Sequence, residues 1–375
     1  PAAPPVRGFN PASMLVGCEG SLGLITRAKL RITPKPRFTG LIVSHYNSLK
    51  EALLGNAVLL TTDPTASELM DRMVLSLAQK QLSISRLMGF LDGEPNSVVI
   101  TEYTADTQAE LEHKLKQAGD LLSKESASYA HPHFTDGVLK TQIWQVRKAG
   151  LPLLLGLPGN RKPVAFIEDT AVDPSRLVEY VERFDQIVQS HGTTDAYYAH
   201  ASVGCLHIRP LLDLKSEADI QTMARLSDEI SDLVMEFEGS MSGEHGDGLA
   251  RGLWNKKQFG PVIYEVFREI KKLFDPAGIL NPGKVVDSPP MTETLRFGAD
   301  YKTMEVQTDL NWTAEGGFVT AVELCNGAGV CRKTNRGTMC PSFMVTRDEE
   351  HSTRGRANLL RNVLNGRLPH EALHS

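Results

Sequence analysis

The chain has 375 residues, of which 41% are hydrophobic and 23% are charged, as in an ordinary globular protein. Its formal net charge of −5 provides no general basic surface that would gather nucleic acid. No apolar run is long enough to span a bilayer, and the first residues lack the pattern of a signal peptide. At usual domain sizes this length predicts two or three domains.

Helix-like and strand-like patterns alternate along most of the chain, which favours an α+β fold with helices on one face of a mainly antiparallel sheet. Some strands follow one another through short turns, and two β-α-β-like halves predict a duplicated ferredoxin-like arrangement. An alternating run after a glycine-rich turn also predicts a strand within residues 14–36. We expect further strands at 41–46, 97–103, 164–169, 195–201 and 205–210, and helices at 48–60, 106–124, 137–149, 174–190, 216–238 and 261–274.

The first motif is the glycine-rich stretch 17–26, with three glycines in seven residues. Such a stretch allows close approach to a ligand, and its N–H groups could hold a pyrophosphate. A plain turn before a strand is the alternative, because glycine patterns alone are weak signals. Residues 16–36 resemble the segment that closes the FAD-binding domain of vanillyl-alcohol oxidase type flavoproteins, with departures at Cys18 and Ser21. The resemblance implies FAD contacts, made through the backbone, at Gly17, Glu19, Gly20, Gly23 and Ile25.

Histidines and a glutamate form a second pattern. His200 and His207 lie in one short segment, and Glu244 and His245 lie between glycines in another. Two neutral imidazoles and a carboxylate suit a divalent cation such as Zn²⁺ or Mn²⁺, with positions left open for a substrate. Each histidine alone is more often a structural or surface residue, but the combination favours a site.

The same two segments resemble the H-x-G-x-G-N-L-H and S-G-E-H-G-x-G motifs of D-lactate and D-2-hydroxyglutarate dehydrogenases and of the glycolate oxidase flavoprotein subunit. The resemblance implies that His200, His207 and Glu244 bind the metal and that His245 is the catalytic base. Cys205 stands where those proteins have asparagine, and the ligand spacing is unchanged.

Three basic residues are candidates to bind a substrate carboxylate. The family has a W-x-x-R helix end whose arginine grips this group, which implies that role for Arg147; a solvated helix face is the alternative. A guanidinium can meet a carboxylate through two parallel hydrogen bonds. Arg209 should share a face with His207 if 205–210 is a strand, and Lys162 is the third candidate.

Residues 274–284, FDPAGILNPGK, have the composition of a helix end followed by a turn. They closely resemble the end of the same family's substrate domain, where the segment returns to the flavin. The resemblance implies a cofactor contact for Asn281 and covers roughly residues 14–287.

The five cysteines are unevenly distributed, and three of them lie in one short segment, as Cys325, Cys331 and Cys340. Their spacing is similar to the ferredoxin pattern C-x₂-C-x₂-C-x₃-C-P, although Ala328 replaces one cysteine and the Cys-Pro pair comes late. Three free thiols, or a zinc site that lacks a ligand, are the alternatives. The segment resembles one in fused FAD-linked oxidases, which implies that the three are 4Fe-4S ligands with the remaining ligands beyond residue 375. In two-cluster ferredoxins the cysteine before proline binds the other cluster, so we expect Cys325 and Cys331 to share one cluster and Cys340 to serve a second.

These resemblances imply FAD-dependent oxidation of a D-2-hydroxyacid of the D-lactate or D-2-hydroxyglutarate type to the 2-oxoacid, with electrons passed to iron–sulfur clusters. We expect residues 1–36 to end a FAD-binding domain, 37–287 to form the substrate domain, and 288–375 to form a linker and the start of a ferredoxin-type helical module. The chain would then lack sequence at both ends. The alternatives are an electron-transfer subunit with an inactive pocket and a FAD-linked oxidase of another alcohol or acid.

The expected partners are a small 2-hydroxyacid and an electron acceptor, either a quinone or an electron carrier. Nucleic acid and a transmembrane segment are not expected, and a homodimer stays open. The expected location is the cytoplasm or the inner face of the membrane.

Overall fold

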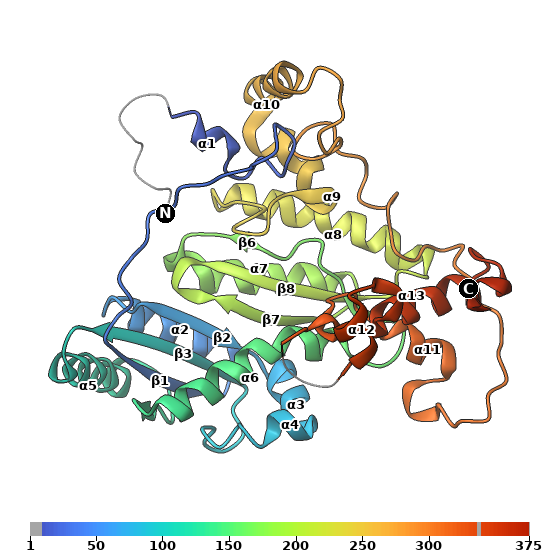
Figure 1. Ribbon diagram of the computed structural model, residues 1–375. Coiled ribbons are helices and arrows are strands. Elements are labelled where there is room, and N and C mark those ends of the chain that lie inside the picture. Colours follow the sequence, from blue (N-terminus) through green and yellow to red (C-terminus); the bar gives the residue numbers. More distant parts are fainter. Residues whose placement is uncertain (1–9, 336–338, 375) are drawn as a thin grey trace. The chain divides into compact units, whose positions relative to one another are not determined.

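The computed structural model describes residues 10–335 and 339–374 (Figure 1). Contacts between residues divide the chain into two compact units. The first comprises Pro1–Leu151, Pro163–Leu211 and Gln221–Leu295, and the second comprises Pro152–Lys162, Leu212–Ile220 and Arg296–Ser375. Within the described ranges, no helix combines the length and the apolar character that crossing a membrane requires.

The first half of the sheet follows the chain order strand, helix, strand, strand, helix, strand. β1 pairs antiparallel with both β3 and β4, and β3 pairs antiparallel with β2. The spatial order β4-β1-β3-β2 is that of a ferredoxin-like unit. Its elements are β1 (Phe38–Tyr46), α2 (Leu49–Leu60), β2 (Ala66–Met70), β3 (Ser97–Ala105), α5 (Gln108–Glu125) and β4 (His133–Phe134).

The second half repeats this order. β7 pairs with β8, β8 pairs with β6, and Ser240 after α8 forms a bridge to Ala171 of β6. The two halves join where β2 pairs with β7, so the predicted duplicated ferredoxin-like arrangement is confirmed. The elements are β6 (Thr170–Ala171), α7 (Leu177–Ser190), β7 (Asp195–His200), β8 (Cys205–Leu212) and α8 (Glu217–Glu236), and the two-residue β5 (Lys162–Pro163) precedes β6 in the chain.

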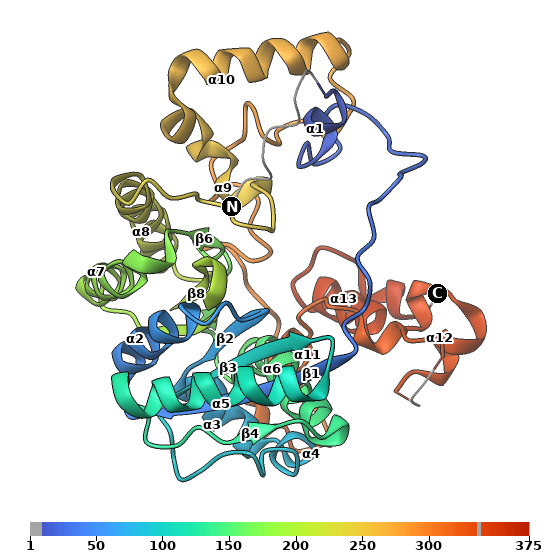
Figure 2. The same cartoon turned by 90° about the vertical axis from the view of Figure 1, so that its left-hand side faces the viewer.

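Helices α2, α5, α7 and α8 lie on one face of the sheet, and α6 (Gly137–Leu155) lies on the other (Figures 1 and 2). Helix α5 illustrates how the sequence builds this layer, since the Thr107 side chain accepts the Glu110 N–H at its first turn. The residues on its buried side recur at helical spacing: Leu111, Leu115, Ala118 and Leu122. Because both faces of the sheet are covered there, β1 and β3 are buried along most of their length.

Two of the predicted strands are wrong. Residues 164–169 form no strand, because the chain bends between β5 and β6 and Asp169 adopts a φ of 77°. Residues 23–36 form no strand either. A strand needs a partner for its N–H and C=O groups, and no strand of the described part of the chain pairs with this segment.

Several elements were not predicted, and one differs from its prediction. β2 is only five residues long and is the strand at the junction of the two halves. Helix α10 begins at Asn255 rather than at 261 and bends at Gly260, where φ is 76° and the next residue is Pro261. The other unpredicted helices are α1 (Ala12–Leu15), α3 (Arg72–Lys80), α4 (Leu82–Ser85) and α9 (Gly248–Arg251).

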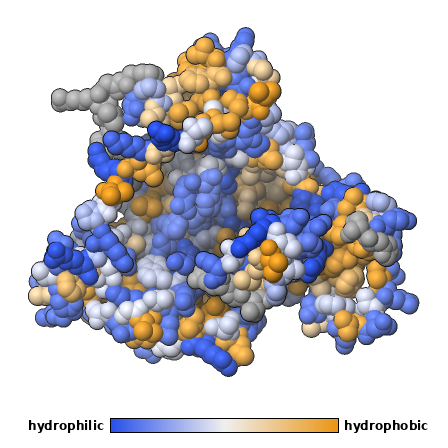
Figure 3. All heavy atoms as spheres, viewed as in Figure 1, coloured by the Kyte–Doolittle hydropathy of each residue, from blue (hydrophilic) through white to orange (hydrophobic). Residues whose placement is uncertain are grey.

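Exposed apolar side chains gather over α10 (Asn255–Phe274), in the upper part of Figure 3. Val262 is 75% exposed and Leu273 is 78% exposed, and Ile263 and Val266 lie between them in the sequence. This face is therefore available to a further apolar surface.

The second unit consists mainly of short helices and irregular chain. Lys215 forms an ion pair of 2.5 Å with Glu323. Cys331, Cys340 and Phe343 form a small buried cluster. The helices are α11 (Phe318–Glu323), α12 (Pro341–Thr346) and α13 (Thr353–Leu364).

The start of β7 carries a partly buried acidic residue, Asp195, that should make the stability of the fold depend on pH. The Tyr197 hydroxyl donates to Asp195 at 2.9 Å and lies 3.4 Å from Asp185. Burial, together with the charges of Asp185 and Asp71, raises the pKa of Asp195 to about 7. An unfolded aspartate loses its proton near pH 4, so between about pH 4 and 7 the folded state holds a proton that the unfolded state has lost. Stability should therefore fall as the pH rises through this window.

Asp195→Asn should abolish this fall in stability with rising pH, because the amide stays neutral and its oxygen can still accept the hydrogen bond from the Tyr197 hydroxyl. Above pH 7 we expect the variant to be more stable than the parent by about 1–4 kcal/mol, and at pH 4 the two should be similar. Urea unfolding at both pH values measures the difference, with the exposed Asp106→Asn as the control. A stabilisation that is the same at both pH values would contradict the assignment.

Candidate active site

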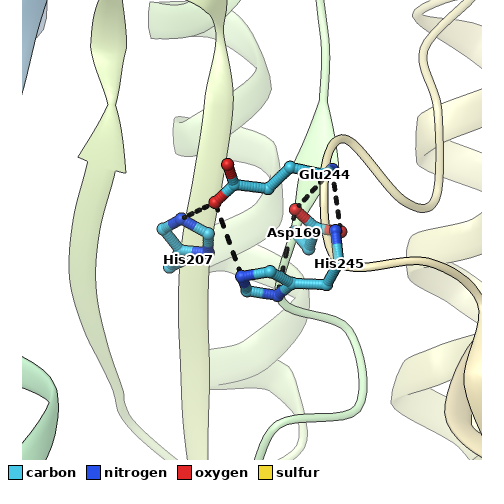
Figure 4. Close-up of side chains that lie close together, drawn as sticks. All are labelled: Asp169, His207, Glu244 and His245. Carbon is cyan, nitrogen blue, oxygen red and sulfur yellow. Dashed lines mark hydrogen bonds and ion pairs between the residues drawn. The ribbon is translucent and has the colours of Figure 1, made fainter. Parts of the chain in front are cut away.

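Side chains from three separate segments converge beside β8 (Figure 4). His207 comes from β8, Asp169 from the bend before β6, and Glu244 and His245 from the loop after α8. One ligand atom from each of these four residues lies within 4.8 Å of the others. The site is thus built by the second half of the sheet and by the loop that follows it.

Asp169 holds this loop in place. Its buried carboxylate accepts the backbone N–H of Glu244 at 3.0 Å and of His245 at 2.8 Å, and the hydroxyl of Ser242 at 2.8 Å. Burial alone would raise the pKa of Asp169, but the hydrogen bonds from His245 and Ser242 outweigh it and lower the pKa. The Cys205 thiol, at the position where the sequence departs from the family motif, lies 3.4 Å from the same carboxylate.

Three imidazole nitrogens converge on one carboxylate oxygen. Oε1 of Glu244 lies 3.0 Å from Nε2 of His200 and 3.4 Å from Nε2 of both His207 and His245. The structure therefore brings together all four residues for which the sequence predicts metal binding or base catalysis. Their individual roles remain predictions.

The imidazoles differ in their electrostatic surroundings. Burial, together with the charges of the neighbouring His200 and His245, lowers the pKa of His207 to about 3. His207 is therefore neutral, which is the form that binds metals. The hydrogen bond to Glu68 raises the pKa of His200, against the effect of burial.

Two glutamates of the site were missed by the sequence reading. Glu68 on β2 lies 2.7 Å from Nδ1 of His200. Glu168 has Oε1 3.6 Å from Nδ1 of His245. The adjacent acidic pair at 168–169 ends an apolar run and could have marked the site, whereas Glu68 belongs to no motif.

The two arginines predicted to bind substrate are already paired with these glutamates. Arg147 donates to Glu68 Oε2 from Nε at 3.1 Å and from Nη2 at 2.7 Å. Nε of Arg209 lies 2.5 Å from Oε2 of Glu168. Tyr198 connects this group to the histidines, because Arg147 lies over its ring at 5.0 Å and the ring stacks on His207 at 4.7 Å.

Lys162, the third candidate, belongs to the second unit. Its ammonium donates to the Leu157 carbonyl, and burial lowers the pKa of the group. Its role at the substrate remains a prediction.

The glycine-rich segment leaves its backbone open to a ligand. Gly17 and Gly20 have φ values of 78° and 73°, and a Cβ atom added to either of them or to Gly23 would meet nothing within 4 Å. The Ile25 side chain is exposed. This surface fits the predicted approach of FAD to the backbone at these residues.

Two of the other predicted cofactor residues join this segment to the active-site loop. The Glu19 carboxylate accepts the N–H groups of Asp247 at 2.5 Å and Gly248 at 2.9 Å. The Asn281 side chain donates to the Glu19 carbonyl at 2.6 Å. The loop after His245 is therefore held by Glu19, whatever further contact Glu19 and Asn281 make with a cofactor.

Glu19→Ala should loosen the loop at one end only, because Asp169 still holds the N–H groups of Glu244 and His245. We expect hydrogen exchange at Asp247 and Gly248 to become about tenfold faster, as suits the loss of bonds to a charged acceptor. Exchange at 244–245 should change much less. The exposed Glu112→Ala on α5 is the control. Equally faster exchange along the whole loop would contradict the assignment of Asp169 to residues 244–245 and of Glu19 to residues 247–248.

Known proteins with similar sequence or fold are FAD-linked oxidases and dehydrogenases. The family model described as FAD linked oxidases, C-terminal domain, matches residues 35–285. The D-2-hydroxyglutarate dehydrogenase of Pseudomonas putida is 32% identical over 97% of the chain and 36% of the relative, and the D-lactate dehydrogenase of Archaeoglobus fulgidus is 28% identical over 74% and 58%. The 4-ethylphenol oxidase from Gulosibacter chungangensis shares the fold, with a TM-score of 0.50 and 14% identity over 68% of the chain and 54% of the oxidase.

The chain thus spans about a third of the length of the D-2-hydroxyglutarate dehydrogenases that it matches. The matched region contains the duplicated sheet and the convergent histidines. By sequence match and by fold, the chain belongs to the FAD-linked oxidases and contains their C-terminal domain.

Proposed function

We propose that the chain supplies the substrate site of a FAD-dependent dehydrogenase that oxidises a D-2-hydroxyacid, of the D-2-hydroxyglutarate or D-lactate type, to the 2-oxoacid. The observation that carries this proposal is the convergence of three Nε2 atoms on Glu244 beside two arginines. The names of the two matched dehydrogenases support the substrate class. A pocket without chemistry would not need this set of residues, which argues against an inactive electron-transfer subunit.

The donor set fits a divalent metal held by His200, His207 and Glu244. Imidazole nitrogens with one carboxylate suit Zn²⁺ or Mn²⁺. The local charge favours a cation as well, because four carboxylates lie against the histidines and only three guanidiniums accompany them. The carboxylates are those of Glu68, Glu168, Asp169 and Glu244, and the guanidiniums are those of Arg147, Arg209 and Arg251.

The chain's own residues divide the remaining tasks. When bound, the metal would acidify the substrate hydroxyl and FAD would accept the hydride. His245 takes the hydroxyl proton at Nε2, while Glu168 faces its Nδ1. Arg147, whose Nε and Nη2 contact Glu68, receives the substrate carboxylate on its Nη1 side, and Arg209 adds a second positive charge next to Tyr198.

His245→Ala should lower kcat by about 10²–10⁴-fold while metal affinity stays within a few-fold of the parent, as expected for loss of a general base. Glu244→Ala should lose both metal and activity. Titration calorimetry with Zn²⁺ and Mn²⁺ measures binding, and turnover of D-2-hydroxyglutarate and D-lactate is measured on FAD-loaded protein.

The exposed His113→Ala on α5 is the control for both measurements. Equal loss of metal in the two site variants would show that His245 is a ligand, since its Nε2 lies as close to Glu244 as that of His207. Full activity after complete removal of metal would contradict the metal-assisted reaction.

We also propose that Cys325, Cys331 and Cys340 are ligands of iron–sulfur clusters that carry electrons away from the flavin. Hydrogen bonds to sulfur favour the thiolate form that clusters require. The Arg354 N–H lies 3.4 Å from the sulfur of Cys331, and the Thr353 hydroxyl lies 3.7 Å from that of Cys340. Desolvation acts to raise the pKa of Cys340, but the hydrogen bonds from Thr353 outweigh it, together with those from neighbouring backbone groups, so the net pKa is lowered.

Anaerobic reconstitution of the intact polypeptide with iron and sulfide should give a cluster signal in electron paramagnetic resonance. Cys331→Ser and Cys340→Ser should each lower the bound iron, because each removes a predicted ligand. The buried Cys18→Ser, in the first unit, is the matched control. If both ligand variants bind as much iron as the parent, Cys331 and Cys340 are not cluster ligands, and the proposed electron path through this segment is contradicted.

A further inference from the structure

Glu68 is the residue through which a predicted metal ligand and a predicted substrate-binding residue are connected. Its Oε1 lies 2.7 Å from Nδ1 of His200, and its Oε2 accepts two hydrogen bonds from Arg147. The side chain is only 13% exposed. The sheet itself sets this contact, because Glu68 of β2 and His200 of β7 are direct partners in the antiparallel register.

A carboxylate at Nδ1 decides which nitrogen of a neutral imidazole carries the proton. With the proton held on Nδ1 by Glu68, the lone pair of His200 lies on Nε2. Nε2 is the atom that faces Glu244 at 3.0 Å, inside the convergent group. Without the carboxylate, the imidazole can turn or change tautomer, and Nε2 no longer has a fixed role.

The same carboxylate also fixes Arg147. The guanidinium is held on one side by Glu68 and lies over the Tyr198 ring at 5.0 Å. Tyr198 in turn stacks on His207 at 4.7 Å. A change at Glu68 therefore reaches both the metal-binding side and the substrate-binding side of the site.

We propose that Glu68 is a positioning residue that orients His200 for metal binding and Arg147 for the substrate carboxylate. The proposal rests on the proposed function for the identity of the bound groups. Glu168 repeats the arrangement in the second half of the sheet, between Arg209 and His245, with a longer distance of 3.6 Å to the imidazole.

Glu68→Gln tests the proposal, because the amide cannot serve both the imidazole N–H and the guanidinium as acceptor. The variant should bind Zn²⁺ or Mn²⁺ about 10–100-fold more weakly than the parent in titration calorimetry, the usual effect of losing a residue that orients a metal ligand. Nitrogen-15 spectra of the histidines should show a single Nδ1-protonated tautomer for His200 in the parent and a mixture in the variant.

Glu102→Gln is the matched control. Glu102 lies on β3 two residues from Ile100, the register partner of Glu68, and its carboxylate bonds to Trp144 rather than to a histidine. It should keep the metal affinity and the His200 spectrum of the parent. Should Glu68→Gln fail to fold, the double variant Glu68→Gln, Arg147→Met removes the unpaired guanidinium and should show the same loss of metal affinity.

The outcomes separate the two proposals. A parent protein that binds no metal would contradict the metal site of the proposed function. The nitrogen-15 spectra would still test the role of Glu68, because they report the tautomer of His200 without a metal. Metal affinity and tautomer equal to the parent in the Glu68 variants would overturn the inference even where the parent binds metal. A loss of affinity in Glu102→Gln of the same size would also overturn it, because the effect would then be a general response of the sheet.

Discussion

The geometry of the site depends on the buried carboxylate of Asp169. It accepts two backbone N–H groups and one hydroxyl from the loop that carries Glu244 and His245, and no other residue among those described bonds to this loop in so many places. A loop rich in glycine has little structure of its own, so its conformation must be imposed by such an acceptor. The left-handed conformation of Asp169 and the bend that replaces the predicted strand are what turn this side chain toward the loop.

The second constraint is the join between the two halves of the sheet. β2 and β7 are the equivalent strands of their ferredoxin-like units, and they pair with each other. This pairing sets Glu68 against His200. The site therefore uses residues from both halves, although its loop and all three of its histidines belong to the second. The Arg147–Glu68–His200 group therefore needs both halves, whereas Arg209, Glu168 and His245 all belong to the second half.

The sequence predicted those parts of the site that local spacing defines. His200, His207, Glu244 and His245 lie in short motifs, and the hairpin of β7 and β8 follows from two strand patterns with a short turn between them. Glu68 could not be found in this way, because it lies 132 positions from His200 and its contact depends on the register of strands that are far apart in the chain. The predicted strand at 164–169 was wrong for a related reason, since its apolar run continues into Glu168 and Asp169, which the fold needs at a bend.

Charge links the metal to the substrate under the proposed function. Arg147 pairs with the partly buried Glu68 and Arg209 with the buried Glu168. A substrate carboxylate must therefore share a guanidinium whose charge is already offset. Removing either glutamate would leave an arginine unpaired, while keeping both leaves an excess of negative charge near the histidines. A divalent cation on His200, His207 and Glu244 would offset that excess and make room for one more carboxylate. Metal binding and substrate binding are therefore expected to strengthen each other, with Glu68 in contact with both sides of the site.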